Sequence, residues 1–270
     1  MISFENLILI TLLSPLLVCL LTPLLSSKPI LRDILGPLGG IISSWGAIQL
    51  MASILNGEQP RLELLQIAEG ISISFVVTPL GAIFGLVASV LWIFAAIYSV
   101  GYMRGNKEKN QTRFYIFYAM AVHAALCIAY AGDLLTLFIF YEVLTFSTYP
   151  LVTHKQNEMA QKAGRLYMSI LVGTSVILLL PAIIWVWVVT GSLEMSQNGV
   201  LDGKMNPDYA PYLLAMFVFG IGKAALMPIH KWLPAAMVAP TPVSALLHAV
   251  AVVKAGVFTM LLILTNVFGI

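Results

Sequence analysis

The sequence contains very little charge. Asp, Glu, Lys and Arg make up 10% of the 270 residues, against about a quarter in an ordinary soluble domain. The 14 basic and 12 acidic side chains are too few to cover the surface of a water-soluble protein of this length. The composition therefore excludes a soluble globular enzyme and indicates that the lipid bilayer is the solvent.

Cysteines and basic tracts are also scarce. The two cysteines, Cys19 and Cys127, lie inside apolar runs without a C-x-x-C spacing, so we interpret them as packing residues rather than metal ligands. No block of Lys and Arg suggests a nucleic-acid partner. Glu5 is the only charged residue before Lys28, which argues against a signal peptide with a positive N-terminal region.

Apolar residues are abundant: 60% of the chain is hydrophobic and its mean hydropathy is +0.94. A membrane-spanning helix needs roughly 20 such residues. The sequence predicts an all-α, polytopic membrane helix bundle with about eight spans. We place these spans near residues 6–26, 34–55, 79–102, 113–131, 134–153, 164–190, 211–239 and 242–268.

The charges between the predicted spans alternate in sign from one side to the other. The connections on one side carry nine basic residues: Lys28, Arg32, Arg104, Lys107, Lys109, Arg113, Lys155, Lys162 and Arg165. The connections on the other side carry only Arg61 and Lys204, together with seven acidic residues. The positive-inside rule then predicts that the basic loops are cytoplasmic and that both termini lie outside.

One outer connection has a strand-like pattern. Ile71, Ile73 and Phe75 alternate with Ser72 and Ser74, which is the period of a β-strand. Residues 61–77 are therefore either a short hairpin or an irregular loop.

Four charged residues remain inside the predicted spans: Glu142, Lys223, Lys231 and Lys254. Each costs roughly 2.5–3.5 kcal/mol to insert, so an ionisable residue at this depth is by default functional. The alternative is a structural ion pair. Asp133 is most simply the N-cap of the fifth span, whereas Glu142 lies mid-span and would be ionised only beside a buried cation.

Lys223 lies in a segment that contains several prolines. Pro228 should interrupt the seventh span, because a proline removes a backbone donor from the helix interior. A broken helix is tolerated at this depth where it lines a wet cavity or is buried in protein. A lysine there could exchange protons near neutral pH. His230 and Lys231 follow the break, as proton-transfer groups or as neighbours of an internal water pocket.

The eighth span carries His248 and Lys254. Histidine titrates near neutral pH, and the six-residue spacing points the two side chains about 120° apart on an ideal helix. They could therefore connect two different neighbours in a relay. We interpret His123, in the fourth span, as a hydrogen-bonded core group, and His154, at a loop edge, as solvated.

Three segments carry a family resemblance: FYEVLTFSTYPLV (140–152), GIGKAALMPIHKWLPAAM (220–237) and APTPVSALLHAVAVVKAG (239–256). They resemble the antiporter-like membrane subunits of respiratory complex I and of Mrp-type cation/proton antiporters, and among these VVKAG is most similar to MrpD. The resemblance implies that Glu142 and Lys223 form a charge pair that controls proton movement. It also implies that His248 and Lys254 continue the path.

The resemblance implies further properties of the chain. Residues 1–110 would form three N-terminal helices with an outer loop, and residues 111–270 the first repeat of an inverted-repeat fold. The partners would be other membrane proteins of an Mrp-type or complex I-like assembly, such as an NADH:quinone oxidoreductase. The chain would bind no redox cofactor and would not be catalytic on its own. The transported ions would be H⁺ or Na⁺ and H⁺, and the location a bacterial plasma membrane.

The sequence departs from this family in one respect, because members have about fourteen spans in two inverted repeats. We expect this chain to contain only the first repeat. A non-conducting scaffold, as a truncated or half subunit, is therefore the main alternative. An intramembrane metal-dependent hydrolase is a third hypothesis, and the scattered histidines without an H-E-x-x-H motif argue against it.

Overall fold

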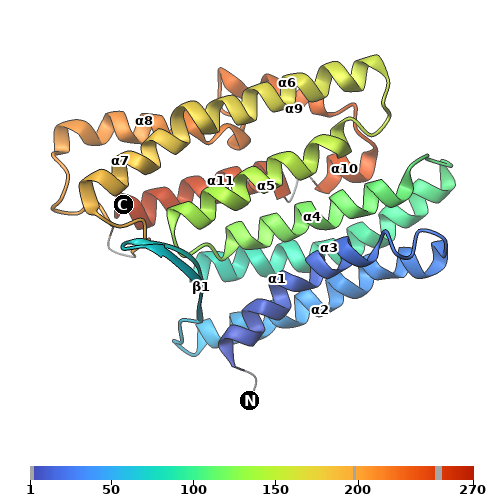
Figure 1. The fold of residues 1–270 in the computed structure, drawn as a ribbon, viewed down its shortest axis with the longest axis horizontal. Coiled ribbons are helices and arrows are strands. Elements are labelled where there is room, and N and C mark those ends of the chain that lie inside the picture. Colours follow the sequence, from blue (N-terminus) through green and yellow to red (C-terminus); the bar gives the residue numbers. More distant parts are fainter. Residues whose placement is uncertain (1–2, 197–198, 247–250) are drawn as a thin grey trace.

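The computed structural model describes residues 3–196, 199–246 and 251–270 (Figure 1). Within them the chain is mainly helical, with one two-stranded sheet. The helices and strands are α1 (Phe4–Leu21), α2 (Pro29–Leu55), β1 (Arg61–Ala68), β2 (Ile71–Val76), α3 (Pro79–Gly105), α4 (Gln111–Ala129), α5 (Leu134–Val152), α6 (Glu158–Thr174), the π-helix η1 (Ser175–Leu179), α7 (Leu180–Thr190), α8 (Ala210–Gly220), α9 (Trp232–Ala236), α10 (Thr241–Leu246) and α11 (Val252–Leu262), which continues as the π-helix η6 (Ile263–Val267).

The helices lie roughly side by side (Figure 1). Helix α2 packs on α1 and α3, and all three pack on α4, which also packs against α5. Helix α5 in turn contacts α6, and α11 contacts α4. The two termini lie toward the end of the bundle that carries the sheet, as Figure 1 shows.

The predicted membrane bundle is confirmed. Among the described residues, six helices are long and apolar enough to cross a membrane. The sixth runs without interruption over 33 residues, Glu158–Thr190, so it begins six residues earlier than the predicted span at 164. The seventh predicted span is not a single helix, because α8 ends at Gly220. Within the eighth predicted span the described residues form α10 and, beyond the undescribed residues 247–250, α11 with η6.

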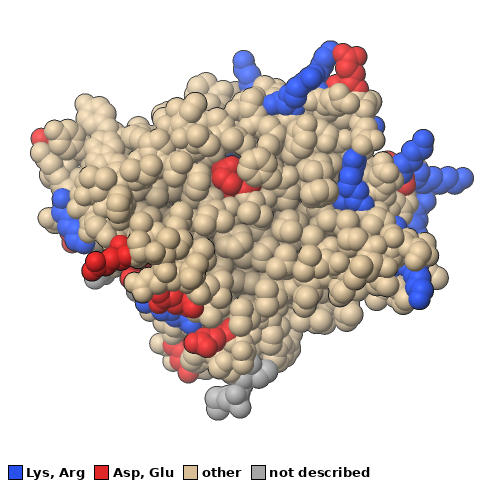
Figure 2. All heavy atoms as spheres, viewed as in Figure 1, with Lys and Arg blue, Asp and Glu red and all other residues tan. Residues whose placement is uncertain are grey.

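Charge is distributed along the bundle as the sequence predicts. Figure 2 shows Lys and Arg gathered at the end away from the sheet, with a broad, almost uncharged band between the two ends. We call the Lys- and Arg-rich end the basic end, and the end with β1 and β2 the hairpin end. Large apolar side chains are exposed on the helices, among them Leu20, Phe94 and Ile177, which is the surface expected of a protein that faces lipid tails.

A proline inside α1 shows how the bundle compensates for a lost backbone hydrogen bond. Pro15 has no N–H and cannot bond the Thr11 carbonyl oxygen one turn earlier. The Ser43 hydroxyl of α2 donates to that oxygen over 3.0 Å. A neighbouring helix thus satisfies the freed carbonyl at membrane depth, as the bilayer requires.

The hairpin hypothesis for residues 61–77 is confirmed. Strands β1 and β2 pair antiparallel, with Arg61 opposite Val76 and Leu62 opposite Phe75. Asp133 anchors the sheet to α5: its carboxylate accepts from the Thr136 backbone N–H at 2.7 Å and from the Ser74 hydroxyl at 2.9 Å. The predicted N-cap role of Asp133 is therefore confirmed, and the same side chain also fixes the sheet.

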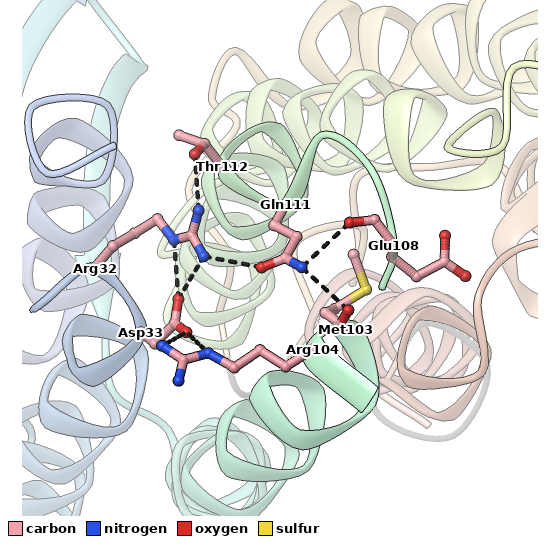
Figure 3. Close-up of polar contacts among 7 residues, drawn as sticks. All are labelled: Arg32, Asp33, Met103, Arg104, Glu108, Gln111 and Thr112. Atoms are coloured by element: carbon pink, nitrogen blue, oxygen red, sulfur yellow. Dashed lines mark hydrogen bonds and ion pairs between the residues drawn. The ribbon is translucent and has the colours of Figure 1, made fainter. Parts of the chain in front are cut away.

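Near the basic end, a buried ion network joins α2, α3 and α4 (Figure 3). Asp33 accepts from both flanking guanidiniums, at 2.9 Å from Arg32 Nε and 2.6 Å from Arg104 Nε. Arg32 also donates to Gln111 Oε1 at 2.9 Å and Thr112 Oγ1 at 3.1 Å. The sequence places Arg32 in the connection after the first span; this is wrong, because α2 begins at Pro29 and buries Arg32.

Candidate ion-translocation site

The predicted break in the seventh span is confirmed, but it begins before Pro228. Helix α8 ends at Gly220, and a single 3₁₀ turn, η3 (Gly222–Ala224), follows. Ala225 has a left-handed backbone with φ of +55°, a conformation that stops any right-handed helix. The Met227–Pro228 peptide bond is cis, and a second 3₁₀ turn, η4 (Ile229–Lys231), precedes α9. Pro228 is therefore not the residue that ends the helix.

Glycines let neighbouring helices approach the backbone of the break. A Cβ atom at Gly256 of α11 would collide with the backbone of Lys223 and Ala224. A Cβ at Gly222 would collide with the Thr174 hydroxyl of α6. The turn η3 is thus held between α6 and α11, which buries Gly222 and Lys223 in protein. Residues 226–228, beyond this turn, are exposed.

Lys223 lies at the centre of the break and is 0% exposed. Its Nζ donates to the Tyr141 carbonyl oxygen at 2.7 Å and to Thr145 Oγ1 at 2.6 Å. The same Nζ lies 3.1 Å from the centroid of the Tyr141 ring, and the Lys223 backbone N–H donates to the Tyr141 hydroxyl at 3.1 Å. A single turn of α5 therefore supplies both acceptors and the aromatic ring that surround this ammonium group.

Glu142 follows Tyr141 on α5 and is partly buried. Both carboxylate oxygens are shielded from the surface, and neither has a hydrogen-bond partner in the described part of the chain. Glu142 interacts electrostatically with Lys223, but the ion pairs found among the described residues, all within 4.0 Å, do not include these two. Glu142 and Lys223 therefore lie near each other, but the Lys223 amine bonds the Tyr141 carbonyl and the Thr145 hydroxyl instead of the Glu142 carboxylate.

Further polar groups line the region beyond Lys223. The Thr148 hydroxyl, one turn along α5 from Thr145, bonds the Tyr167 hydroxyl of α6. Trp232 Nε1 donates to the Gly222 carbonyl at 2.9 Å, and its ring meets that of Tyr167 edge-on at 5.5 Å. The sequence analysis indicated no role for Thr148, Tyr167 or Trp232. The signal that could have shown the α5 residues is their spacing: Thr145 is four residues after Tyr141, and Thr148 three after Thr145, so the three share a helix face.

The other predicted relay residues differ from Lys223 in their exposure. Lys254 is exposed on α11, at an apolar groove of about 290 Å³ between α3 and α11. His230 is partly buried, with its Nδ1 atom enclosed and without a partner among the described residues, and Lys231 is exposed. His248 lies outside the described residues. The structure thus places Lys223 and Glu142 together, and Lys254 on another face.

Two further histidines test the interpretation of the sequence. His123 Nδ1 lies 2.8 Å from the Leu12 carbonyl oxygen, which confirms the hydrogen-bonded core role. His154 was expected to be solvated, and this is wrong because it is only 4% exposed. Its ring packs edge-on against Phe114. Burial, followed by the nearby Arg113 charge, lowers the pKa of His154.

The fold and the site define a class of protein: a polytopic membrane helix bundle whose seventh span is unwound around a buried lysine. The family model described as NADH:quinone oxidoreductase/Mrp antiporter, TM matches residues 131–269, about half of the chain. A second model, described as NADH-Ubiquinone oxidoreductase (complex I), chain 5 N-terminus, matches residues 65–115. The chain therefore belongs to the NADH:quinone oxidoreductase/Mrp antiporter family, and the predicted membership is confirmed.

Individual relatives agree with the family. The chain is 25% identical over 247 residues to the putative antiporter subunit mnhA2 of Staphylococcus haemolyticus, covering 90% of this chain and 31% of that protein. It is 30% identical over 184 residues to the mnhA2 protein of Staphylococcus aureus strain MRSA252, covering 67% and 23%. The chain thus spans less than a third of the length of these curated relatives. The predicted likeness to MrpD stays a prediction.

Solved structures share the fold. A chain of the membrane-bound sulfane sulfur reductase, an archaeal respiratory membrane complex, superposes with a TM-score of 0.83 at 25% identity, covering 97% of this chain and 41% of that one. A chain of the Mrp complex from Dietzia sp. DQ12-45-1b superposes with a TM-score of 0.82 at 21% identity, covering 98% and 49%. The likeness shows the bundle architecture.

Proposed function

We propose that the chain is a proton-translocating subunit of a multi-subunit, Mrp-type or complex I-like complex in a bacterial plasma membrane. The observation that carries the proposal is the fully buried Lys223, which lies in an unwound span next to Glu142. An isolated ammonium at this depth is costly, and it is worth keeping where the site must bind and release a proton. The positive-inside rule makes the basic end cytoplasmic and both termini external.

In this proposal Lys223 carries the proton on Nζ. Loss of that proton leaves a neutral amine, whose lone pair accepts the next proton, so each cycle moves one proton through the site. Glu142 favours the ammonium form when the two groups approach, because an opposite charge within about 4–6 Å stabilises the charged state. Withdrawal of Lys223 from Glu142 removes that stabilisation and favours release.

The released proton would pass to Lys254 by way of His248, with His230 and Lys231 as a water-pocket wall or a side branch. Lys254 is exposed at the α3–α11 groove, where it can meet a neighbouring protein or segment. The coupled ion is H⁺ alone or Na⁺ with H⁺. The partners are other membrane subunits and the bilayer, and the host is an Mrp-type antiporter or an NADH:quinone oxidoreductase-like translocase.

The second candidate is a non-conducting scaffold that keeps the fold and its contacts with partner subunits. The two candidates differ in whether proton movement depends on Lys223.

The test is proton uptake by the assembled complex in lipid vesicles. Glu142→Gln and Lys223→Ala should each abolish uptake while the complex assembles normally. Lys204→Ala, in the loop at the hairpin end, removes a lysine outside the site and is the matched control that should transport normally. Unchanged uptake in both site variants would favour the scaffold and reject the relay.

A further inference from the structure

We infer that the Tyr141 carbonyl and the Thr145 hydroxyl form a holding site for the Lys223 ammonium that competes with the Glu142 carboxylate. Thr145 is then a positioning residue that sets the fraction of Lys223 bound at this site and the fraction bound to Glu142. This inference rests on the proposed function, because it assigns a role to Thr145 within the same proton site.

The two oxygens are arranged to receive a cation. They lie 2.7 and 2.6 Å from Lys223 Nζ, distances typical of charge-assisted hydrogen bonds. Thr145 Oγ1 also lies 3.1 Å from the Tyr141 carbonyl and can donate its single proton there. With that proton committed, the hydroxyl presents only lone pairs to Lys223. The Tyr141 ring adds a cation–π contact on the same side.

The holding site is as buried as the amine that it binds. Tyr141, Thr145 and Lys223 are each 0% exposed. Water cannot readily replace either acceptor, so loss of the Thr145 hydroxyl would leave part of the ammonium unsatisfied. The contact therefore matters more here than it would at a surface.

The Glu142 carboxylate competes with this site for the Lys223 ammonium. Its carboxylate oxygens have no hydrogen-bond partner in the described part of the chain, although the residue lies in the same turn of α5 as the two groups that hold the amine. A compact ammonium on a flexible stem can reach different acceptors by side-chain rotation. The structure thus represents the separated arrangement, in which Thr145 and the Tyr141 carbonyl hold Lys223.

Other titratable groups near Lys223 come from each element packed on the break. Helix α5 contributes Tyr141 and Glu142, and α6 contributes Tyr167, which interacts electrostatically with Glu142. Turn η4 contributes the partly buried His230 and the exposed Lys231, and α11 carries the exposed Lys254. A pH effect of changing Thr145 must be compared with a variant that leaves all of these groups in place.

The experiment measures the pH dependence of proton uptake by the assembled complex in lipid vesicles. In Thr145→Val the alkaline limb should move to lower pH by about one unit, because losing one hydrogen bond to a charged group costs about a tenfold factor. Thr145→Ser retains the hydroxyl and should restore the wild-type profile. Thr11→Val removes an equally buried hydroxyl that also bonds a carbonyl one turn earlier, but on α1, and should leave the limb in place.

An unshifted limb in Thr145→Val, or an equal shift in Thr11→Val, would overturn the inference. Thr145→Ala replaces Thr145→Val if the valine variant fails to assemble, because alanine adds no methyl group beside Lys223. Complete loss of uptake at every pH in Thr145→Ala, with Thr145→Ser active, would also contradict a positioning role. If Lys223→Ala still transports, the proposed function itself fails; if it does not and Thr145→Val is unshifted, only this inference fails.

Discussion

Replacing Asp33 with Asn should destabilise the bundle strongly. Among the residues of the network in Figure 3, Asp33 is the only one whose carboxylate pairs with Arg32 and Arg104. The side chains of Arg32 and Asp33 are 7% and 4% exposed. Removing one partner of a buried pair costs about 3–5 kcal/mol, since it leaves an uncompensated charge.

The expected magnitude is at the lower end, about 3 kcal/mol. The Arg104 side chain is 45% exposed and can be rehydrated, and Arg32 keeps its bonds to Gln111 and Thr112. For a protein of this size that loss corresponds to a fall in Tm of roughly 6–12 °C.

The assay is thermal unfolding of the purified protein in lipid nanodiscs, followed by tryptophan fluorescence. The control is Glu158→Gln, which breaks an exposed pair with Lys162 four residues along α6 and should cost less than about 1 kcal/mol. A Tm for Asp33→Asn equal to that of Glu158→Gln would refute the reasoning, because it would mean that the network contributes no more than a surface pair.

The buried histidine, the glycine beside the break and the order of the spans each lead to a further prediction. Burial lowers the pKa of His154, whereas in the unfolded chain a histidine has a pKa near 6.5. Below about pH 6.5 the unfolded chain therefore binds a proton that the folded protein does not, and stability should fall. His154→Phe should show a smaller fall in Tm between about pH 7.5 and 5.5 than the wild-type protein does. Gly256→Val should prevent stable folding because its side chain meets the backbone of the break, whereas Gly101→Ala, with no heavy atom within 4 Å, should be tolerated in the same expression and Tm measurements. Reporter fusions at Glu108 and Ile270 should report opposite sides of the membrane, and agreement between them would reject the span order.

The sequence was sufficient to predict the apolar architecture. The predicted spans at 79–102 and 134–153 match α3 and α5 to within three residues, because long apolar runs bounded by turn residues leave few alternatives. The alternation of Ile71, Ile73 and Phe75 indicated a strand and left a hairpin and an irregular loop as alternatives, of which the structure has the hairpin. The spans and the strand both follow from the pattern of neighbouring residues, which a single sequence shows directly.

Interactions between distant segments were not predictable in the same way. The helix break was attributed to Pro228, but α8 already ends at Gly220, against the backbone of Leu179. The sequence places Arg32 in the connection after the first span, yet Asp33 pairs with it inside the bundle. A charge at the edge of an apolar run is compatible with either outcome until its partners are placed, and Arg104 lies 71 residues away from Asp33.

The candidate site also contains residues that the sequence identified and residues that it did not. Glu142 and Lys223 were identified as charges inside apolar runs, a local property. The role of Thr145 depends on the approach of η3 to α5, and no sequence period predicts that contact. The path from Lys223 through His248 to Lys254 stays a prediction.

Proton uptake by the Lys223→Arg variant tests the central claim most directly. Arginine keeps the positive charge but does not release its proton under these conditions. The account predicts that the variant assembles and that its uptake falls to the background of Lys223→Ala in the same vesicles. Full uptake by Lys223→Arg, with normal assembly, would show that Lys223 is a structural charge and not a proton carrier.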